Sequence, residues 1–154
     1  MSSENAVVEL ELGKALVLCQ LFENSLLMLL SLLSEHKLPS EGAAFLLVWD
    51  FVSKKPLGQL FQYLKNDLEL PQDFQQYLQD GIDLRNELVH RFIRENIGLL
   101  ANESGRREAV VKIKTIAREV RKRDRAVGKL IDVLLTKYGL SQATLKELSG
   151  RLYN

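Results

Sequence analysis

One short segment of this sequence brings together polar and charged residue types that could do chemistry at the spacing of one helix. Residues 85–90 read R-N-E-L-V-H, so that Arg85 and Asn86 precede His90 by five and four positions. Arginine presents a planar, permanently charged fork to phosphate oxygens, and histidine side chains titrate near neutrality, where they can accept or donate a proton. Arg91 and Arg94 add positive charge directly after the histidine. The segment is therefore the one cluster in the sequence whose residue types could form a functional site.

On a helix, Arg85 would take a position that an apolar residue fills elsewhere on the same stripe, which consists of Leu78, Ile82, Val89 and Phe92. Its guanidinium is then expected at a packed surface or the edge of a cleft. Asn86, His90 and Arg94 would share one polar strip, while Arg85 and His90 would lie about 140° apart and flank a groove without touching. A simpler alternative stays open: Arg85 pairs with a carboxylate, Asp83 or Glu87, and His90 is an ordinary surface histidine.

A second basic feature follows in residues 106–129, which hold ten basic residues and three acidic ones. On a helix, four of them share a stripe opposite the apolar seam: Lys114, Arg118, Arg121 and Arg125. Such a stripe is expected to follow a nucleic-acid backbone, most of all at the R-K-R-D-R segment, 121–125. The alternative is a solvated helix face that the acidic half of the protein partly neutralises. No aromatic residue interleaves the stripe, so base stacking has no platform there.

The sequence lacks the residues that other kinds of functional site require. The glycines are too widely spaced for a phosphate-binding loop, and no GxSxG sequence occurs. Two histidines, one cysteine and no HExxH argue against zinc. Glu87 and His90 have the spacing of a di-iron helix pair, but a second such pair is missing. We therefore expect no metal and no cofactor.

Apolar residues recur at steps of three and four along nearly the whole chain, which predicts helices. The expected helices cover residues 6–35, 45–52, 57–66, 73–97, 110–138 and 141–148. Residues 112–115 would also suit a strand. We expect an all-α protein, an antiparallel (up-down) bundle of five to six helices in one domain, 1–154. The first helix is apolar well beyond one face, so it is either central to the bundle or also packs against another subunit.

The net charge of +1 hides an asymmetry along the 154 residues. Residues 1–80 carry a net charge of −6 and residues 81–154 a net charge of +7, which points to an anionic partner for one face. Cys19 is expected to be a buried, inert thiol. The most apolar run, 26–33, is far shorter than a bilayer span, so a cytoplasmic protein with no membrane partner is expected.

The R-N-x-x-x-H pattern on a helix resembles the signature of the HEPN superfamily, whose all-helical members include prokaryotic toxin–antitoxin, abortive-infection and CRISPR-associated ribonucleases. The P-L-G-Q-L segment at 56–60 also resembles that group, and a similar segment occurs in the mannitol operon repressor family. The helix order is similar over roughly residues 1–140. Specific residues match only at 56–60 and 84–92.

The resemblance implies a metal-independent endoribonuclease that cuts RNA by attack of the ribose 2′-hydroxyl on the adjacent phosphate. His90 would be the general base or acid, Arg85 would hold the phosphate, and Asn86 would orient the imidazole or the phosphate. In the family, the motif helices of two protomers meet, so a homodimer is expected to complete a groove whose Arg85 and His90 are too far apart to act within one chain. A cognate antitoxin of the nucleotidyltransferase type is a further expected partner. The alternative is a non-catalytic relative, a regulatory or binding module such as a transcriptional or antitoxin-type regulator, that binds nucleic acid or a nucleotide in the same groove.

Overall fold

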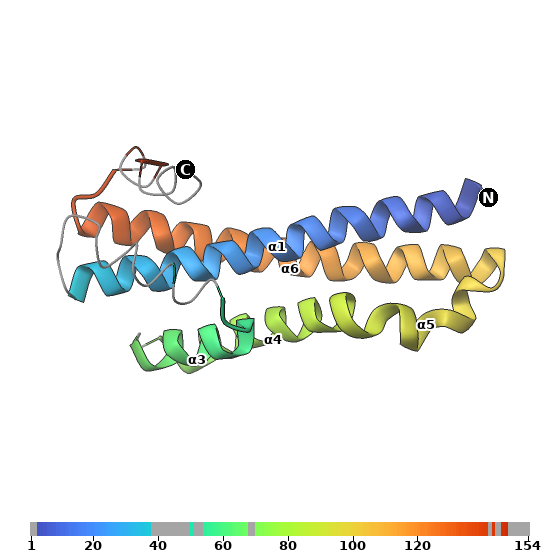
Figure 1. Cartoon of the computed structure of the whole chain (residues 1–154), viewed down its shortest axis with the longest axis horizontal. Helices are drawn as coiled ribbons and strands as arrows, with labels where there is room; N and C mark the ends of the chain where they lie inside the picture. The colour runs from blue at the N-terminus through green and yellow to red at the C-terminus, as the bar shows by residue number, and fades with distance from the viewer. Residues whose placement is uncertain are drawn as a thin grey trace. The chain divides into compact units, whose positions relative to one another are not determined.

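The computed structural model describes residues 3–37, 50, 54–67, 70–141, 143 and 146–147. Every regular element in these residues is helical (Figure 1): α1 (Ser3–Lys37), α3 (Leu57–Asp67), α4 (Gln72–Asn86), the π-helix η1 (Glu87–Arg91), α5 (Phe92–Leu100) and α6 (Glu103–Lys137). The prediction of an all-α protein is confirmed. Most of the helix expected at 45–52, all but residue 50, lies outside the described residues, as do residues 142, 144, 145 and 148 of the one expected at 141–148.

The long helices follow the apolar periodicity that predicts them. α1 begins three residues earlier and ends two residues later than expected, and α6 includes residues 112–115, so the strand alternative there is wrong. Gly139, with φ 67°, ends α6 as expected: its N–H donates to the carbonyl of Thr136, and the N–H of Leu140 donates to the carbonyl of Leu135. This pair of bonds is a Schellman motif, which favours glycine at the left-handed position.

The chain forms two compact units, each built partly from the two long helices. The first unit comprises Met1–Phe22 and Pro71–Asp124, and the second comprises Glu23–Leu70 and Arg125–Asn154. The residues predicted to do chemistry, 85–94, belong to the first unit. One domain over residues 1–154 stays a prediction.

Within the first unit, the starting halves of α1 and α6 run in the same direction, and α4 to α5 runs back against both (Figure 1). Polar contacts join these helices. For example, Arg106 of α6 reaches Glu4 of α1, and Lys112 and Arg123 of α6 donate to Asn96 of α5 and to the backbone carbonyl of Tyr77 in α4. Apolar side chains from all of them are buried: Val8, Ala15, Cys19, Phe22, Leu78, Ile82, Leu88, Phe92, Ala109, Ile113, Ile116 and Val120. The burial expected for the Cys19 thiol is confirmed.

In the second unit, the ending halves of α1 and α6 and the short helix α3 supply the buried residues. They are almost all leucine: Leu26, Leu27, Leu29, Leu30, Leu32, Leu33, Leu57, Leu60, Phe61, Leu64, Val127, Ile131, Leu134 and Leu135. Ser31 is also buried, and its hydroxyl donates to the carbonyl of Leu27. The excess of apolar residues in the second half of α1 is therefore explained by burial in the core.

One helix, α1, contains over Glu4–Leu33 a stretch long and apolar enough to cross a bilayer, with a mean hydropathy of 1.9. Half of that stretch is buried against the protein. The core helix of a soluble bundle meets the same criterion, so this helix does not decide where the protein resides. The cytoplasmic location stays a prediction.

Candidate functional site

The helix that carries the predicted motif is interrupted at the motif itself. Residues 73–97 were expected to form one helix, and they do lie in a continuous helical segment, but Glu87–Arg91 is a π-helix between α4 and α5. A π-turn closes its hydrogen bonds between residues five apart, whereas an α-turn closes them between residues four apart. Such single π-turns are rare and often occur at functional sites.

This turn brings Arg85 and His90 together. Nη1 of Arg85 lies 3.1 Å from Nε2 of His90 and donates a second hydrogen bond, of 2.9 Å, to Oδ1 of Asn86. The prediction that Arg85 and His90 flank a groove without touching is wrong, because it assumed 100° per residue through the whole segment. All three predicted catalytic residues meet at one guanidinium nitrogen.

The contact assigns a role to each of the two groups. A guanidinium has only donors, so in this hydrogen bond Nε2 of His90 is the acceptor. His90 is exposed, whereas Arg85 and Asn86 are half-buried. The site thus combines a half-buried, hydrogen-bonded arginine with a solvent-exposed histidine.

The contact also removes the geometric argument for a second chain. Arg85 and His90 are close enough to act within one protomer, so no partner is needed to complete this pair. A homodimer remains an expectation that rests on the family resemblance and on the surface beside the motif.

The apolar stripe expected on this helix is correct at Leu78, Ile82 and Phe92 but wrong at Val89. Val89 is 37% exposed, and its neighbour Leu88 is buried. The cause is again the π-turn, which interrupts the α-helical periodicity between residues 87 and 91. The regular polar strip expected for Asn86, His90 and Arg94 assumed the same periodicity. Arg91 and Arg94 are both exposed near His90 on this segment.

The predicted basic stripe is exposed at all four of its positions: Lys114, Arg118, Arg121 and Arg125. Arg123, in the middle of the R-K-R-D-R segment, is instead 7% exposed. Its side chain is anchored inside the first unit, so it cannot bind a nucleic acid without leaving those partners. Only part of this segment is available to a ligand.

The anchoring of Arg123 is a feature that the sequence reasoning missed. Its Nε donates to the carbonyl of Tyr77 (2.8 Å), its Nη1 donates to the carbonyl and carboxylate of Glu119, and its guanidinium lies over the Tyr77 ring. The side chain passes over Gly81, where a Cβ would overlap Cδ of Arg123. A glycine inside the helix, one turn before Arg85, was the available signal.

These contacts also affect a nearby carboxylate. Hydrogen bonds from Lys122 and Arg123 hold the pKa of Glu119 below its ordinary value. Glu119 therefore stays ionised and keeps Arg123 in place at neutral pH. The described residues contain no cluster of three or more histidine, cysteine or acidic side chains that could hold a metal ion.

No family model matches this chain, and no curated protein or solved structure matches it either. The likeness to HEPN proteins therefore rests on residues 56–60 and 84–92 and on the helical character of the protein. The geometry of Arg85, Asn86 and His90 is therefore the basis for inferring the chemistry of the candidate site.

Proposed function

We propose that this protein is an endoribonuclease of HEPN type, an antiparallel bundle of five to six helices that cuts RNA without a metal ion. The observation that carries the proposal is the Arg85 guanidinium, which bridges Asn86 and His90 across a π-turn. A cation that binds phosphate is held directly beside an imidazole that can accept a proton. The test is cleavage of RNA by the purified protein in EDTA.

In the proposed mechanism, the scissile phosphate displaces Nε2 of His90 and Oδ1 of Asn86 as the acceptors of Arg85. The lone pair on Nε2 is thereby freed and takes the proton of the ribose 2′-hydroxyl. The 2′-oxygen attacks phosphorus, the bond from phosphorus to the 5′-oxygen breaks, and the departing oxygen takes a proton from the imidazolium that His90 has become. The products are a 2′,3′-cyclic phosphate and a 5′-hydroxyl. Arg85 neutralises the charge that develops on the phosphoryl oxygens.

The proposal includes a homodimer in which the motif helices of two protomers meet. Val89, Ile93 and Ile97 are exposed at intervals of four residues, and this apolar row begins beside His90. Exposed apolar rows of this kind are typical of surfaces that another subunit covers. A partner seated there would bring its own copy of the motif close to that of the first protomer.

For the dimer, we expect sedimentation at micromolar concentration to give twice the 17.6 kDa mass of one chain. Ile97→Asp, at a position 66% exposed, should give the monomer, because it places a charge in the apolar row. Val133→Asp changes a similarly exposed valine of α6 in the second unit and should leave the dimer intact. A monomeric wild type would remove the dimer from the proposal.

Lys114, Arg118, Arg121 and Arg125, with Arg91 and Arg94, are proposed to bind the RNA backbone. Reversal of charge at Arg121 and Arg125 should weaken RNA binding and lower the slope of log affinity against log salt by roughly 0.7 for each phosphate that the protein no longer neutralises. Lys137→Glu, at the far end of α6, is the matched control. A slope unchanged in the Arg121→Glu/Arg125→Glu variant would assign these residues to solvation.

A non-catalytic binding module is the second candidate. It is favoured by the same contact, because Nε2 of His90 is already occupied by Arg85 and would become a base only after the arginine moves. Such a protein would bind RNA or a nucleotide phosphate and release it unchanged. A nucleotidyltransferase-type antitoxin and a cytoplasmic location are part of the ribonuclease proposal and rest on the family resemblance.

A further inference from the structure

A second face of the first unit, away from the motif, carries an apolar row on α1. Val7, Leu10, Val17 and Leu21 are between 45% and 56% exposed. They are separated by three, seven and four residues, and Lys14 occupies the remaining position of the series. This is the heptad spacing by which one helix packs along another. The same helix buries a different face in the core, so this row is surplus to the fold of the chain.

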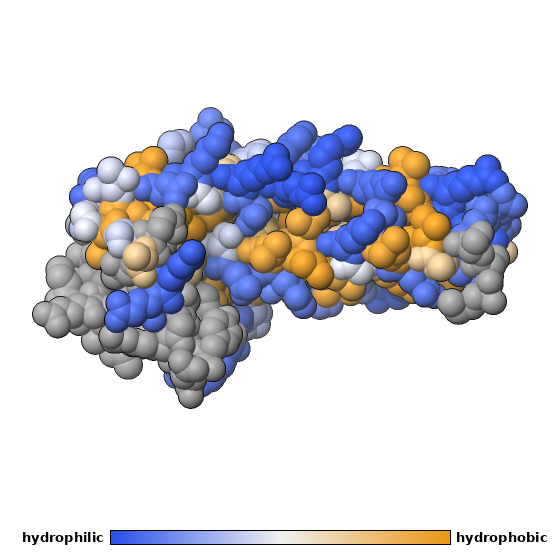
Figure 2. Space-filling model, turned by 90° about the horizontal axis from the view of Figure 1, so that it is seen from above, coloured by the Kyte–Doolittle hydropathy of each residue, from blue (hydrophilic) through white to orange (hydrophobic). Residues whose placement is uncertain are grey.

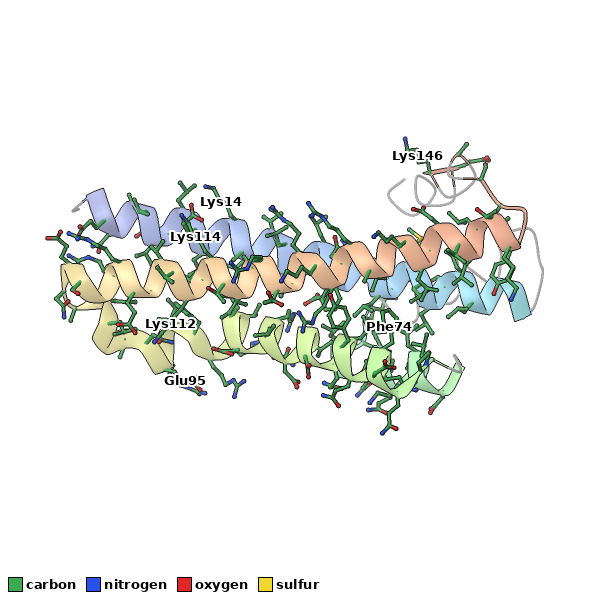
Figure 3. The ribbon with its side chains drawn as sticks, turned by 180° about the vertical axis from the view of Figure 1, so that it is seen from behind. Lys14, Phe74, Glu95, Lys112, Lys114 and Lys146 are labelled. Carbon is green, nitrogen blue, oxygen red and sulfur yellow. The ribbon has the colours of Figure 1, made fainter. Side chains whose placement is uncertain are left out.

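A basic row on α6 runs beside it. Arg107, Val111, Lys114, Arg118 and Arg121 are all exposed and follow one another at steps of four and three. The two rows are in register: Glu4 pairs with Arg107, and seven residues further along each helix Lys114 lies near Glu11. Figure 3 shows Lys14 of α1 and Lys114 of α6 beside each other.

Together the two rows make one surface strip along α1 and α6, which we call the groove after the hollow at its beginning. Near the beginning of both helices the groove deepens into a hollow of about 240 Å³ lined by Glu4, Val7, Arg106, Arg107 and Val110. Figure 2 looks onto this face and shows apolar surface beside a band of strongly hydrophilic surface. The row on α1 thus offers apolar contacts and the row on α6 offers cations.

The cations of this groove exceed the carboxylates that border it. Glu4 is paired with Arg106 and Arg107, Glu103 is paired with Arg107, and Glu119 is paired with Arg118. Glu11 accepts a hydrogen bond from Lys14, which holds its pKa below the ordinary value. Each of these acidic groups is already used within the chain. The groove therefore presents net positive charge to an incoming partner.

We propose that this groove binds an amphipathic α-helix of a partner protein, with apolar residues at heptad spacing toward α1 and acidic residues along the edge toward α6. A second copy of this chain fits less well, because the same face of a second copy would bring an excess of cations. RNA also fits less well, because phosphates and riboses gain nothing from the row of Val7, Leu10, Val17 and Leu21. An acidic amphipathic helix satisfies both rows at once.

The inference does not depend on RNA cleavage, since Arg85 and His90 are not part of the groove. It shares Lys114, Arg118 and Arg121 with the proposed RNA-binding row. A docked helix would therefore cover these side chains and compete with RNA for them.

The probe is a pair of fluorescent synthetic peptides of three heptads with leucine at the packing positions. One carries glutamate along the flank and the other carries lysine at the same positions. Anisotropy titrations with the full chain should show the glutamate peptide bound at least ~10-fold more tightly than the lysine peptide. Leu10→Asp/Val17→Asp should weaken the glutamate peptide at least ~10-fold, because two charges enter the apolar row of α1. Arg118→Glu/Arg121→Glu should reverse the preference between the peptides.

Control variants outside the groove test whether peptide binding is specific to it. Val133→Asp and Lys137→Glu change an exposed valine and an exposed lysine of α6 in the second unit, and both should bind the glutamate peptide as the wild type does. His90→Ala should also bind it normally, so a failure of the ribonuclease proposal would leave this result unaffected. Circular dichroism checks that each variant keeps its helical content.

Several results would overturn the proposal. They are no binding of the glutamate peptide, equal binding of both peptides, and normal binding by Leu10→Asp/Val17→Asp. Conversion of a dimer to a monomer by Leu10→Asp/Val17→Asp would assign the face to a second copy. Loss of single-stranded RNA binding in Arg118→Glu/Arg121→Glu with the peptide unaffected would assign the basic row to RNA.

Discussion

His90→Ala is expected to lower the rate of RNA cleavage in EDTA by about 10²–10⁴-fold, the usual range for removal of a general base or acid. Arg85→Ala should have an effect of similar size, because it removes the charge that binds the phosphate and the donor that positions the imidazole. The measurement is single-turnover cleavage of a labelled RNA, with the products analysed for a 2′,3′-cyclic phosphate.

Two further variants make this result specific. Arg85→Lys keeps the charge but loses the planar fork that bridges Asn86 and His90, so it should recover little of the activity. His36→Ala removes the other histidine of the chain and should cleave at the wild-type rate. Equal rates for wild type and His90→Ala would contradict the ribonuclease proposal. RNA that binds wild type tightly and is released uncut would support the binding module instead.

The contacts of Asn86 favour a role in positioning Arg85 over a direct role in catalysis. Its Oδ1 accepts a hydrogen bond from Arg85, and within the described part of the chain no hydrogen bond joins it to His90. We therefore infer that Asn86 aims the guanidinium, while the alternative of orienting the imidazole has no contact to support it. In the proposed mechanism the amide releases Arg85 when a phosphate arrives, which keeps the arginine seated until substrate binds.

The helices could be predicted from the sequence because the 3.6-residue period of apolar side chains is long and regular. α1 and α6 each maintain it over 35 residues, and the Schellman motif at Gly139 follows from a glycine directly after the last apolar position. Local sequence is enough for such features, because the residues that decide them are neighbours along the chain.

The π-turn could not be predicted in the same way. Residues 85–92 have an apolar pattern that fits a regular α-helix, with Leu88 and Val89 both available for the core. Which of them is buried depends on packing between helices, and the structure buries Leu88. The same packing determines the most informative contact of the site, between Arg85 and His90. The residue types of the site were therefore predictable, but their mutual geometry was not.

Arg123 is a second case in which tertiary contacts decide what a local pattern leaves open. Within R-K-R-D-R, the helical period places Arg121 and Arg125 opposite the apolar seam and Arg123 in line with Val120 and Val127, but it does not indicate how a charged side chain is accommodated there. The accommodation comes from Tyr77 and Gly81, more than forty positions earlier, which supply a backbone acceptor, an aromatic face and room for the side chain. A pairing over that separation has no signature in a single sequence.

Gly81→Ala is expected to destabilise the protein by about 1–3 kcal/mol, the usual cost of overpacking a well-packed site. The new Cβ would overlap Cδ of Arg123 and would lie 3.1 Å from Cζ of Phe22. Arg123 would have to give up its hydrogen bond to the carbonyl of Tyr77, and a hydrogen bond from a charged group contributes roughly 1.5–3 kcal/mol. Chemical denaturation followed by circular dichroism measures the change in the free energy of unfolding.

Gly98→Ala is the matched control, because Gly98 is also helical and a Cβ there would meet nothing within 4 Å. It should stabilise the protein by up to about 1 kcal/mol, since alanine favours a helix more than glycine does. The two substitutions are chemically identical and have opposite expected signs. If Gly81→Ala also stabilised the protein, Arg123 would have to be free to move, and its anchoring between α4 and α6 would be wrong.

A double-mutant cycle tests whether Arg123 is the cause of the cost. Arg123→Ala should itself be destabilising, because it removes the partner of the Tyr77 carbonyl and the contact with the Tyr77 ring. In that background the added methyl of Gly81→Ala no longer overlaps Cδ of Arg123, so most of its cost should disappear and only the contact with Phe22 should remain. If the destabilisations of Gly81→Ala and Arg123→Ala simply add in the double variant, the two residues do not interact. A coupling of more than about 0.5 kcal/mol would establish that Gly81 is there to let Arg123 cross α4, one turn before the arginine of the site.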